Sequence, residues 1–227
     1  MNRYFNYSRR LYQEAHLVSR TFGRQLIIAD GMPRSGSTLM YNAIRIALEA
    51  RSPSVSCGWV GDASRMKAAD YNVVKLHFAD FLMRWRADLV FYSYRDVRDA
   101  MVSAERKFAI APSVERARKM IRKDMRARKR ADHVFSFERL TDDVEGVAAE
   151  IIQAVASPIG VAELVGKLPS KSLSSQAEAV DQNTQMHGGH ATGVGKGDWR
   201  NEIDARVTDA VNREFGWWFE LNGYPLS

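Results

Sequence analysis

The sequence predicts an α/β fold in three layers, with a central, mostly parallel sheet and helices on both of its faces. Two observations support this prediction. Short apolar runs alternate with amphipathic stretches along most of the chain, and the apolar runs are nearly continuous. Continuous apolar runs are typical of parallel strands that are buried on both faces. The 227 residues suffice for one well-buried domain, so residues 1–227 are interpreted as a single unit.

The expected elements follow one another in a regular order. Residues 8–24 are expected to form a polar leading helix. Gln25–Asp30 is a compact apolar run before a turn signal, which indicates a buried strand. Residues 38–49 place apolar side chains on one helical face. Later strands are expected at 71–76, 89–94 and 133–137, and later helices at 79–86, 97–108, 113–130 and 142–156.

The C-terminal third is less regular. Residues 169–197 are rich in Ser, Gln, Asn and Gly and show no clear period. A loop of this length is usually a functional lid or disordered. The segment leads into the glycine-rich stretch 193–201, which favours a lid. Residues 214–224 are rich in aromatic side chains and are expected to form a docked terminal helix.

Composition limits the classes of function. The net charge of +6 suits an anionic ligand, although nucleic acid or a membrane surface would suit it equally. Cys57 is the only cysteine, which excludes an internal disulfide and a Cys-based zinc site. No apolar run approaches the roughly 20 residues that span a bilayer. The N-terminal stretch is too polar for a secretory signal, so a reducing cytoplasm is the expected location.

Residues 31–38, GMPRSGST, have the spacing of a phosphate-binding loop. The two glycines permit close approach of an anion, the hydroxyls add donors, and Arg34 adds a permanent charge. Ser37 stands where nucleoside triphosphatases have a lysine that reaches the β- and γ-phosphates, which argues against γ-phosphoryl transfer. The alternative is an ordinary turn between strand and helix with a serine cap.

Three further stretches carry chemistry. Arg95 follows a strand and Ser103 lies two turns into the next helix, so both can reach an anion at the sheet edge. The alternative is that the charged residues at 95–99 only form surface ion pairs. Lys75 and His77 share one side of a strand end, which suits a general base beside developing negative charge. The alternative is that Lys75 is an ordinary solvated lysine and His77 an ordinary core histidine. The stretch 193–201 either closes over an anion or is a flexible loop.

Taken in this order, these motifs resemble the sulfotransferases that use 3′-phosphoadenosine 5′-phosphosulfate (PAPS). PRSGST at 33–38 looks like the family's 5′-phosphosulfate loop, and KLH at 75–77 is similar to its Lys-Thr-His. RDVRDAMVS at 95–103 matches its 3′-phosphate motif. FSFERL at 135–140 stands where the family has Tyr-Glu-Asp-Leu, and GDWRN at 197–201 resembles Gly-Asp-Trp-Lys-Asn. The resemblance runs from residue 25 to about 201.

The resemblance implies a P-loop-like fold and an in-line transfer of the sulfuryl group to a hydroxyl or amine acceptor, with adenosine 3′,5′-bisphosphate (PAP) as product. His77 would be the general base, Lys75 would lie beside the transferring group, and Arg34 would stabilise the leaving charge. No metal is implied. The donor-binding residues would be Arg34, Ser35, Gly36, Ser37, Thr38, Arg95, Ser103, Lys196, Gly197 and Trp199.

Several positions depart from the family pattern. Leu39 stands where many members have a tryptophan against the adenine, and Phe137 replaces a tyrosine. The family's Arg-Lys-Gly falls on Thr192, Gly193 and Val194 when Gly-Asp-Trp is aligned without gaps. Two other functions stay open. The first is a P-loop kinase-like phosphotransferase, and the second is a non-catalytic module that binds adenosine bisphosphate or RNA.

The acceptor is expected to be a small molecule, a lipid or a carbohydrate, with nucleic acid disfavoured; the sequence does not indicate an oligomeric state. The basic run 115–130 is either a solvated helix face or an attractant for an anionic acceptor. Four aromatic residues either line an apolar acceptor pocket or belong to the core: Trp59, Phe78, Phe81 and Trp85.

Overall fold

The computed structural model describes residues 3–169, 181–186 and 192–227, and the side chains in these ranges from residue 8 onward. Most of the predicted lid, at 170–180 and 187–191, lies outside the described residues.

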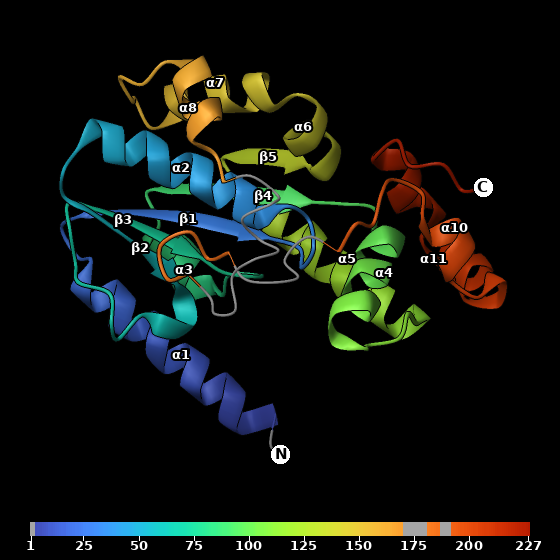
Figure 1. Ribbon diagram of the computed structural model, residues 1–227. Coiled ribbons are helices and arrows are strands. Elements are labelled where there is room, and N and C mark those ends of the chain that lie inside the picture. Colours follow the sequence, from blue (N-terminus) through green and yellow to red (C-terminus); the bar gives the residue numbers. More distant parts are fainter. Residues whose placement is uncertain (1–2, 170–180, 187–191) are drawn as a thin grey trace.

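Within the described residues a five-stranded sheet forms the centre of the molecule, and every strand pair is parallel (Figure 1). The strand order is β2-β3-β1-β4-β5. The chain leaves β1 toward β2 and β3 on one side and then crosses to β4 and β5 on the other, so the strand order reverses around β1. Open parallel sheets bind ligands at such a switch point, beyond the carboxyl ends of the strands. The strands are β1 (Gln25–Gly31), β2 (Val55–Trp59), β3 (Tyr71–Lys75), β4 (Leu89–Tyr94) and β5 (His133–Ser136).

Helices cover both faces of the sheet, which confirms the three-layer prediction. Side chains alternate along β1: Ile27 and Ala29 pack under α2, α7 and α8, whereas Leu26 and Ile28 pack against α1, η1 and α3. These covering elements are α2 (Ser37–Arg51), α7 (Val144–Ala154) and α8 (Val161–Lys167) on one face, and α1 (Arg3–Arg20), the 3₁₀ turn η1 (Val60–Asp62) and α3 (Phe81–Arg86) on the other.

A third apolar cluster lies beyond the carboxyl ends of the strands, where α4, α5 and α11 pack on one another. Trp218 and Phe219 of α11 are buried in it, which confirms that the aromatic tail is a docked helix. The elements here are α4 (Val97–Phe108), α5 (Val114–Arg128), α10 (Trp199–Glu202) and α11 (Ala205–Leu221), with α6 (Phe137–Asp142) between β5 and α7.

The structure differs from the sequence prediction at several places, among them the terminal helix, which occupies Ala205–Leu221 rather than 214–224, and the unpredicted α10. The leading helix occupies Arg3–Arg20 rather than 8–24. Strand β2 was not predicted, because its residues VSCGW mix small and polar types and depend on pairing with β3. Helix α8 was also missed, since it is only seven residues long. Phe137 begins α6 instead of ending β5, because the Ser136 side chain accepts a hydrogen bond from Arg139 N and caps the helix there.

The turn from β1 to α2 contains two residues in the left-handed backbone region, Arg34 at φ 71° and Gly36 at φ 79°. A Cβ on Gly36 would lie 3.3 Å from both Leu140 and Phe137 side chains. A residue with a side chain would therefore add backbone strain and steric pressure at this point.

We expect Gly36→Ala to lower the free energy of unfolding by about 1–2 kcal/mol through left-handed strain. Gly166→Ala is the matched control: Gly166 lies inside α8 with open space around its Cα, so the same change should stabilise by about 0.5–1 kcal/mol. Urea unfolding of both variants measures the difference. Equal effects would contradict the strain argument.

Candidate functional site

The site is built at the carboxyl ends of β1, β3 and β4, which lie side by side in the sheet. The loop after β1 leads into α2, whose N-cap Gly36 provides no side-chain hydrogen bond to the helix. An uncapped helix N-terminus attracts anions through its backbone N–H groups and its dipole. The loop is therefore open to the anion that its sequence predicts.

Ser35 and Gly31 hold the loop close to β4. Ser35 Oγ and Ser93 Oγ are hydrogen-bonded at 2.7 Å and both side chains are buried. A Cβ on Gly31 would lie 2.4 Å from Ser93 Oγ, so only glycine fits there. In this structure the Ser35 hydroxyl fixes the loop to the sheet.

Thr38 and Lys75 join the loop to β3. Lys75 Nζ donates a hydrogen bond to Thr38 Oγ1 at 2.5 Å, and both residues are buried. Burial, followed by the charges of Arg34 and Lys107, lowers the pKa of Lys75 to about 8. The ammonium group is thus held at the first turn of α2 with little water around it.

Arg34 connects the loop to α4. Its Nε donates to Ser103 Oγ at 2.8 Å, and Ser103 Oγ also hydrogen-bonds Thr192 Oγ1 at 2.8 Å. Burial, then the positive charge of Arg95, lowers the pKa of Arg34. The structure therefore brings together two residues from different sequence motifs.

Arg95 is buried just after β4. Its Nη2 donates to the carbonyl oxygens of Val194 and Gly195, both at 2.8 Å, and its guanidinium lies 4.0 Å from the centre of the Phe137 ring. Its Nε is buried and has no hydrogen-bond partner within the described part of the chain. A buried N–H without an acceptor is costly, so a ligand that supplied one would be stabilised here.

His77 stands at the end of β3 in a fixed orientation. Its Nδ1 lies 2.9 Å from the carbonyl oxygen of Gly31. Since a carbonyl only accepts, Nδ1 carries the proton in the neutral ring and Nε2 keeps its lone pair. The Trp59 ring packs edge-on at 5.4 Å between centroids. Burial, then the positive charge of Lys75, lowers the pKa of His77 to about 4, so the ring is neutral near pH 7.

Asp30 holds the backbone that follows His77. Its buried carboxylate accepts the N–H groups of Phe78 at 2.6 Å and Ala79 at 2.9 Å, and it pairs with Arg84 at 3.0 Å. Phe78 itself has a positive φ of 57°. The predicted strand end therefore turns sharply after His77, and Asp30, which sequence reasoning missed, supports the turn.

Three predicted donor-binding residues lie in the C-terminal segment. Asp99 of α4 accepts the N–H groups of Gly197 at 2.9 Å and Trp199 at 3.1 Å. The Trp199 ring is buried against the Arg98 guanidinium, 3.8 Å from its centre. Lys196 is exposed and paired with Asp142. Direct donor contacts by these three residues stay predictions.

Lys107 was missed by the sequence argument, although its position four residues after Ser103 on α4 could have indicated it. Burial, then the charge of Arg34, lowers its pKa to about 8. The helix therefore adds a further cation to the side of the site that Arg34 occupies.

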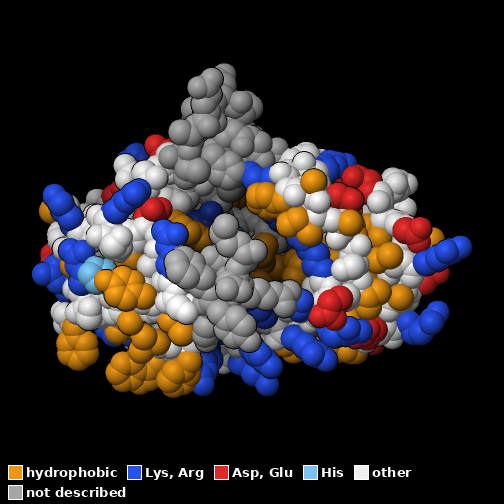
Figure 2. All heavy atoms as spheres, turned by 90° about the horizontal axis from the view of Figure 1, so that it is seen from below, with side chains coloured by type: hydrophobic (Ala, Val, Ile, Leu, Met, Phe, Trp, Pro, Cys, Tyr) orange, Lys and Arg blue, Asp and Glu red, His pale blue; other side chains and the backbone are white. Residues whose placement is uncertain are grey.

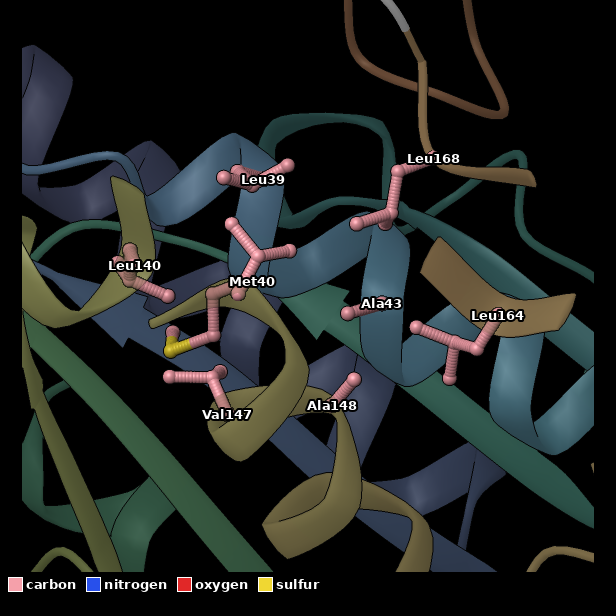
Figure 3. A pocket seen from close by; sticks show the side chains of 9 residues that line it. Leu39, Met40, Ala43, Leu140, Val147, Ala148, Leu164 and Leu168 are labelled. Carbon is pink, nitrogen blue, oxygen red and sulfur yellow. The ribbon is translucent and has the colours of Figure 1, made fainter. Parts of the chain in front are cut away.

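An apolar pocket lies beside the start of α2, between that helix and α6, α7 and α8 (Figure 3). The side chains point toward one another from the four helices, and none carries a charge. This pocket offers packing surface rather than chemistry. It is lined by Leu39, Met40, Ala43, Leu140, Val144, Val147, Ala148, Leu164 and Leu168.

The described ranges contain no group of three or more His, Cys, Asp and Glu side chains arranged to hold a metal ion. Among the helices of those same ranges, none combines the length and the apolar character needed to cross a bilayer.

Solved structures with the same fold include a sulfotransferase and a retinol dehydratase. The mouse sulfotransferase SULT7A1 complexed with PAP superposes with a TM-score of 0.60 at 14% identity, over 92% of this chain and 88% of that one. Retinol dehydratase in complex with androsterone and inactive cofactor PAP gives 0.56 at 13% identity, over 92% and 85%. The same enzyme with retinol and PAP gives 0.54 at 11%, with the same coverage.

No family model and no curated protein matches the sequence. The likeness therefore rests on three-dimensional structure: the chain has the P-loop-like α/β fold of these PAP-bound enzymes.

Proposed function

We propose that this chain is a sulfotransferase, which moves the sulfuryl group of PAPS to a hydroxyl or amine acceptor. The observation that carries the proposal is the meeting of three strand ends in one cationic site. Arg34 donates a hydrogen bond to Ser103, and Lys75 donates one to Thr38. His77 lies beside them, and its hydrogen bond with the carbonyl oxygen of Gly31 orients the ring. The shared fold with PAP-bound sulfotransferases supports the same conclusion.

The site fits a nucleotide with two separate anionic groups. A 3′-phosphate beside Arg95 and Ser103 would give the buried Nε of Arg95 the acceptor that it lacks within the described residues. Arg34, Lys75 and the N-terminus of α2 would hold the 5′-phosphosulfate, with donors from residues 35–38. Cations and helix N-termini are the usual partners of such groups.

Phe137 offers an aromatic ring beside Arg95 and the turn at Gly36. Its ring faces the Arg95 guanidinium, and it packs where a side chain on Gly36 would lie. We assign adenine to this ring, which compensates for Leu39 at the family's tryptophan position. Gly197 and Trp199 would brace the C-terminal segment against α4, and Lys196 would reach the donor only after leaving Asp142.

The catalytic roles follow from geometry. His77 Nε2 has the free lone pair needed to accept the proton of the attacking hydroxyl or amine. Lys75 would stabilise negative charge on the sulfuryl oxygens, and Arg34 would stabilise the departing phosphate oxygen. Preorganised cations in a water-poor site act more strongly than they would in water.

Thr38 favours sulfuryl over phosphoryl transfer. In nucleoside triphosphatase loops the hydroxyl at this position binds Mg²⁺. Here Thr38 Oγ1 accepts a hydrogen bond from the Lys75 ammonium, so a cation of the chain already occupies this hydroxyl. A P-loop kinase would instead require ATP with Mg²⁺. A non-catalytic module for adenosine bisphosphate or RNA would bind PAP without turnover.

The neighbouring structures also bear on the acceptor. Retinol dehydratase is seen with androsterone and with retinol, which are small molecules. By analogy, we propose a small-molecule or lipid acceptor for this chain, and a carbohydrate acceptor is the alternative to test.

Recognition of the 3′-phosphate is tested by calorimetry with PAP and AMP. The native chain should prefer PAP, and Arg95→Ala should weaken PAP by about 10- to 100-fold, because a charge-assisted contact contributes about 1.5–3 kcal/mol. AMP should be little affected. Arg65→Ala, at a highly exposed side chain, is the control. Equal losses for both nucleotides, or no preference for PAP, would refute the assignment.

The pKa of His77 should rise when PAP binds, because the anion offsets the charges of Lys75 and Arg34 that help to lower it. By linkage, PAP then binds more tightly as pH falls through the pKa of the complex. Histidine NMR titration with and without PAP measures this, with His16 and His133 as internal references. An unchanged or lowered pKa would place the anion away from His77.

Turnover is tested by transfer of labelled sulfate from PAPS to a panel of phenols, sterols, lipids, sugars and amines. We expect product with EDTA present, and His77→Ala should abolish it while PAP binding stays within about threefold, since the ring contributes the base rather than donor affinity. ATP with Mg²⁺ serves as the rival donor. Transfer from ATP alone would favour the kinase, and PAP binding without any transfer would favour the non-catalytic module.

A further inference from the structure

Two of the four aromatic residues that the sequence suggested for an acceptor pocket are on the surface instead. The exposed fraction is 67% for Phe81 and 65% for Trp85, which lie one turn apart on α3. Phe22, just after α1, is 74% exposed. Exposed aromatic rings at this density mark an interaction surface rather than random exposure.

These three exposed rings, called the aromatic strip below, lie on or beside the packed helices α1 and α3. Arg86 of α3 lies over the Phe22 ring at 6.0 Å and donates a hydrogen bond to the carbonyl oxygen of Thr21 at the end of α1. Helices α1 and α3 pack on each other. In Figure 2, which views the face that carries these helices, large hydrophobic side chains gather at the lower left.

Positive charge borders this strip on the side of α5. Arg84 of α3 donates to the carbonyl oxygens of Arg126 and Ala127, so the end of α5 lies directly beside α3. Arg130 lies over the Phe81 ring at 5.2 Å. Lys123, Arg126, Lys129 and Arg130 are exposed, and within the described part of the chain no carboxylate pairs with them.

Two carboxylates of this region have partners of their own. Asp80 lies 3.5 Å from Arg10 and also favours the charged form of Lys123, and Asp88 pairs with Arg86 at 3.0 Å. The basic run that the sequence left undecided thus divides into two sets. Arg118 and Arg128 form ion pairs with Glu214 and Asp124, whereas Arg126, Lys129 and Arg130 are exposed and have no carboxylate partner within the described residues.

We propose that Phe22, Phe81 and Trp85, together with the exposed cations Lys123, Arg126, Lys129 and Arg130, form a docking surface for an anionic lipid bilayer. Aromatic rings enter the interfacial region of a membrane, and flanking Lys and Arg side chains bind acidic headgroups. A second copy of this chain would carry the same positive charge on the same face, which disfavours self-association there. The positive charge of this surface therefore favours an anionic bilayer over a second copy of the chain.

The surface also borders the site. Lys123 lies 5.1 Å from the Phe78 ring, and Phe78 follows His77 directly. Docking would place the His77 turn close to the headgroups, so the acceptor would be a lipid or an amphiphile taken from the bilayer. This last step rests on the proposed function, whereas docking itself does not.

Vesicle flotation with the full chain tests the docking. We expect binding to phosphatidylcholine vesicles that contain phosphatidylserine, weak binding to phosphatidylcholine alone, and release by salt. Arg126→Gln with Arg130→Gln should weaken binding roughly thirtyfold, at about fivefold per charge. Phe81→Ser with Trp85→Ser should weaken it on both vesicle types.

Trp217→Ser with Arg206→Gln is the matched control, because both side chains are exposed on α11, which carries none of the residues of the proposed docking surface. It should bind like the native chain. Thermal unfolding and PAP calorimetry on every variant separate loss of docking from loss of fold or of donor binding. Failure to float, equal binding by all variants, or a dimer that Phe81→Ser dissociates would overturn the proposal.

Discussion

The structure depends on one constraint: three cations, Arg34, Lys75 and Arg95, are held together at the carboxyl edge of the sheet. Arg34 and Arg95 follow β1 and β4, Lys75 is the last residue of β3, and each is at least partly removed from water. Burial lowers the pKa of all three, and Arg34 and Lys75 are lowered further by a neighbouring charge. Repulsion between these partly buried cations costs free energy, and a bound anion would relieve that repulsion.

The carboxylates that could neutralise these cations are used elsewhere. Asp30 binds backbone N–H groups behind His77, and Asp96 caps α4 and pairs with the buried Arg98 at 2.7 Å. Asp99 binds the N–H groups of Gly197 and Trp199. Charged groups are expensive to bury unless they are hydrogen-bonded. Each carboxylate therefore fixes a segment of the scaffold through its hydrogen bonds, while the negative charges of Asp99 and Asp96 also favour the charged form of Arg95.

Much of the fold was predictable because its signals are local. The apolar runs of β1, β3 and β4 and the turn at residues 31–38 are visible in the sequence, and the structure confirms the strands. Strand β2 was not predictable from VSCGW alone, since its register comes from β3. The strand order was beyond reach for the same reason, because pairing between distant segments leaves no local pattern.

The sequence predicts which residues lie at the same edge of the sheet, but not which of them form hydrogen bonds with one another. The loop, His77 and Arg95 lie at one sheet edge as parallel strands require. The bond from Arg34 to Ser103 joins residues 69 positions apart, and long side chains have too many rotamers for this pairing to follow from sequence. Whether a lysine such as Lys196 faces the donor or Asp142 is likewise decided by tertiary packing.

Asp30 connects the two surfaces to which function is assigned. Its Oδ1 accepts the N–H of Phe78, which sets the turn after His77. Its Oδ2 accepts a hydrogen bond from Arg84, whose Nη1 donates to carbonyl oxygens at the end of α5. Burial raises the pKa of Asp30 to about 6, so holding this charge is costly and needs all of its partners. If docking at a bilayer displaced α3 or α5, the hydrogen bond between Arg84 and Asp30 would weaken. Because Asp30 also holds the turn after His77, that turn would shift as well. The turn that follows His77, the proposed base, and the position of the aromatic strip thus depend on the same carboxylate.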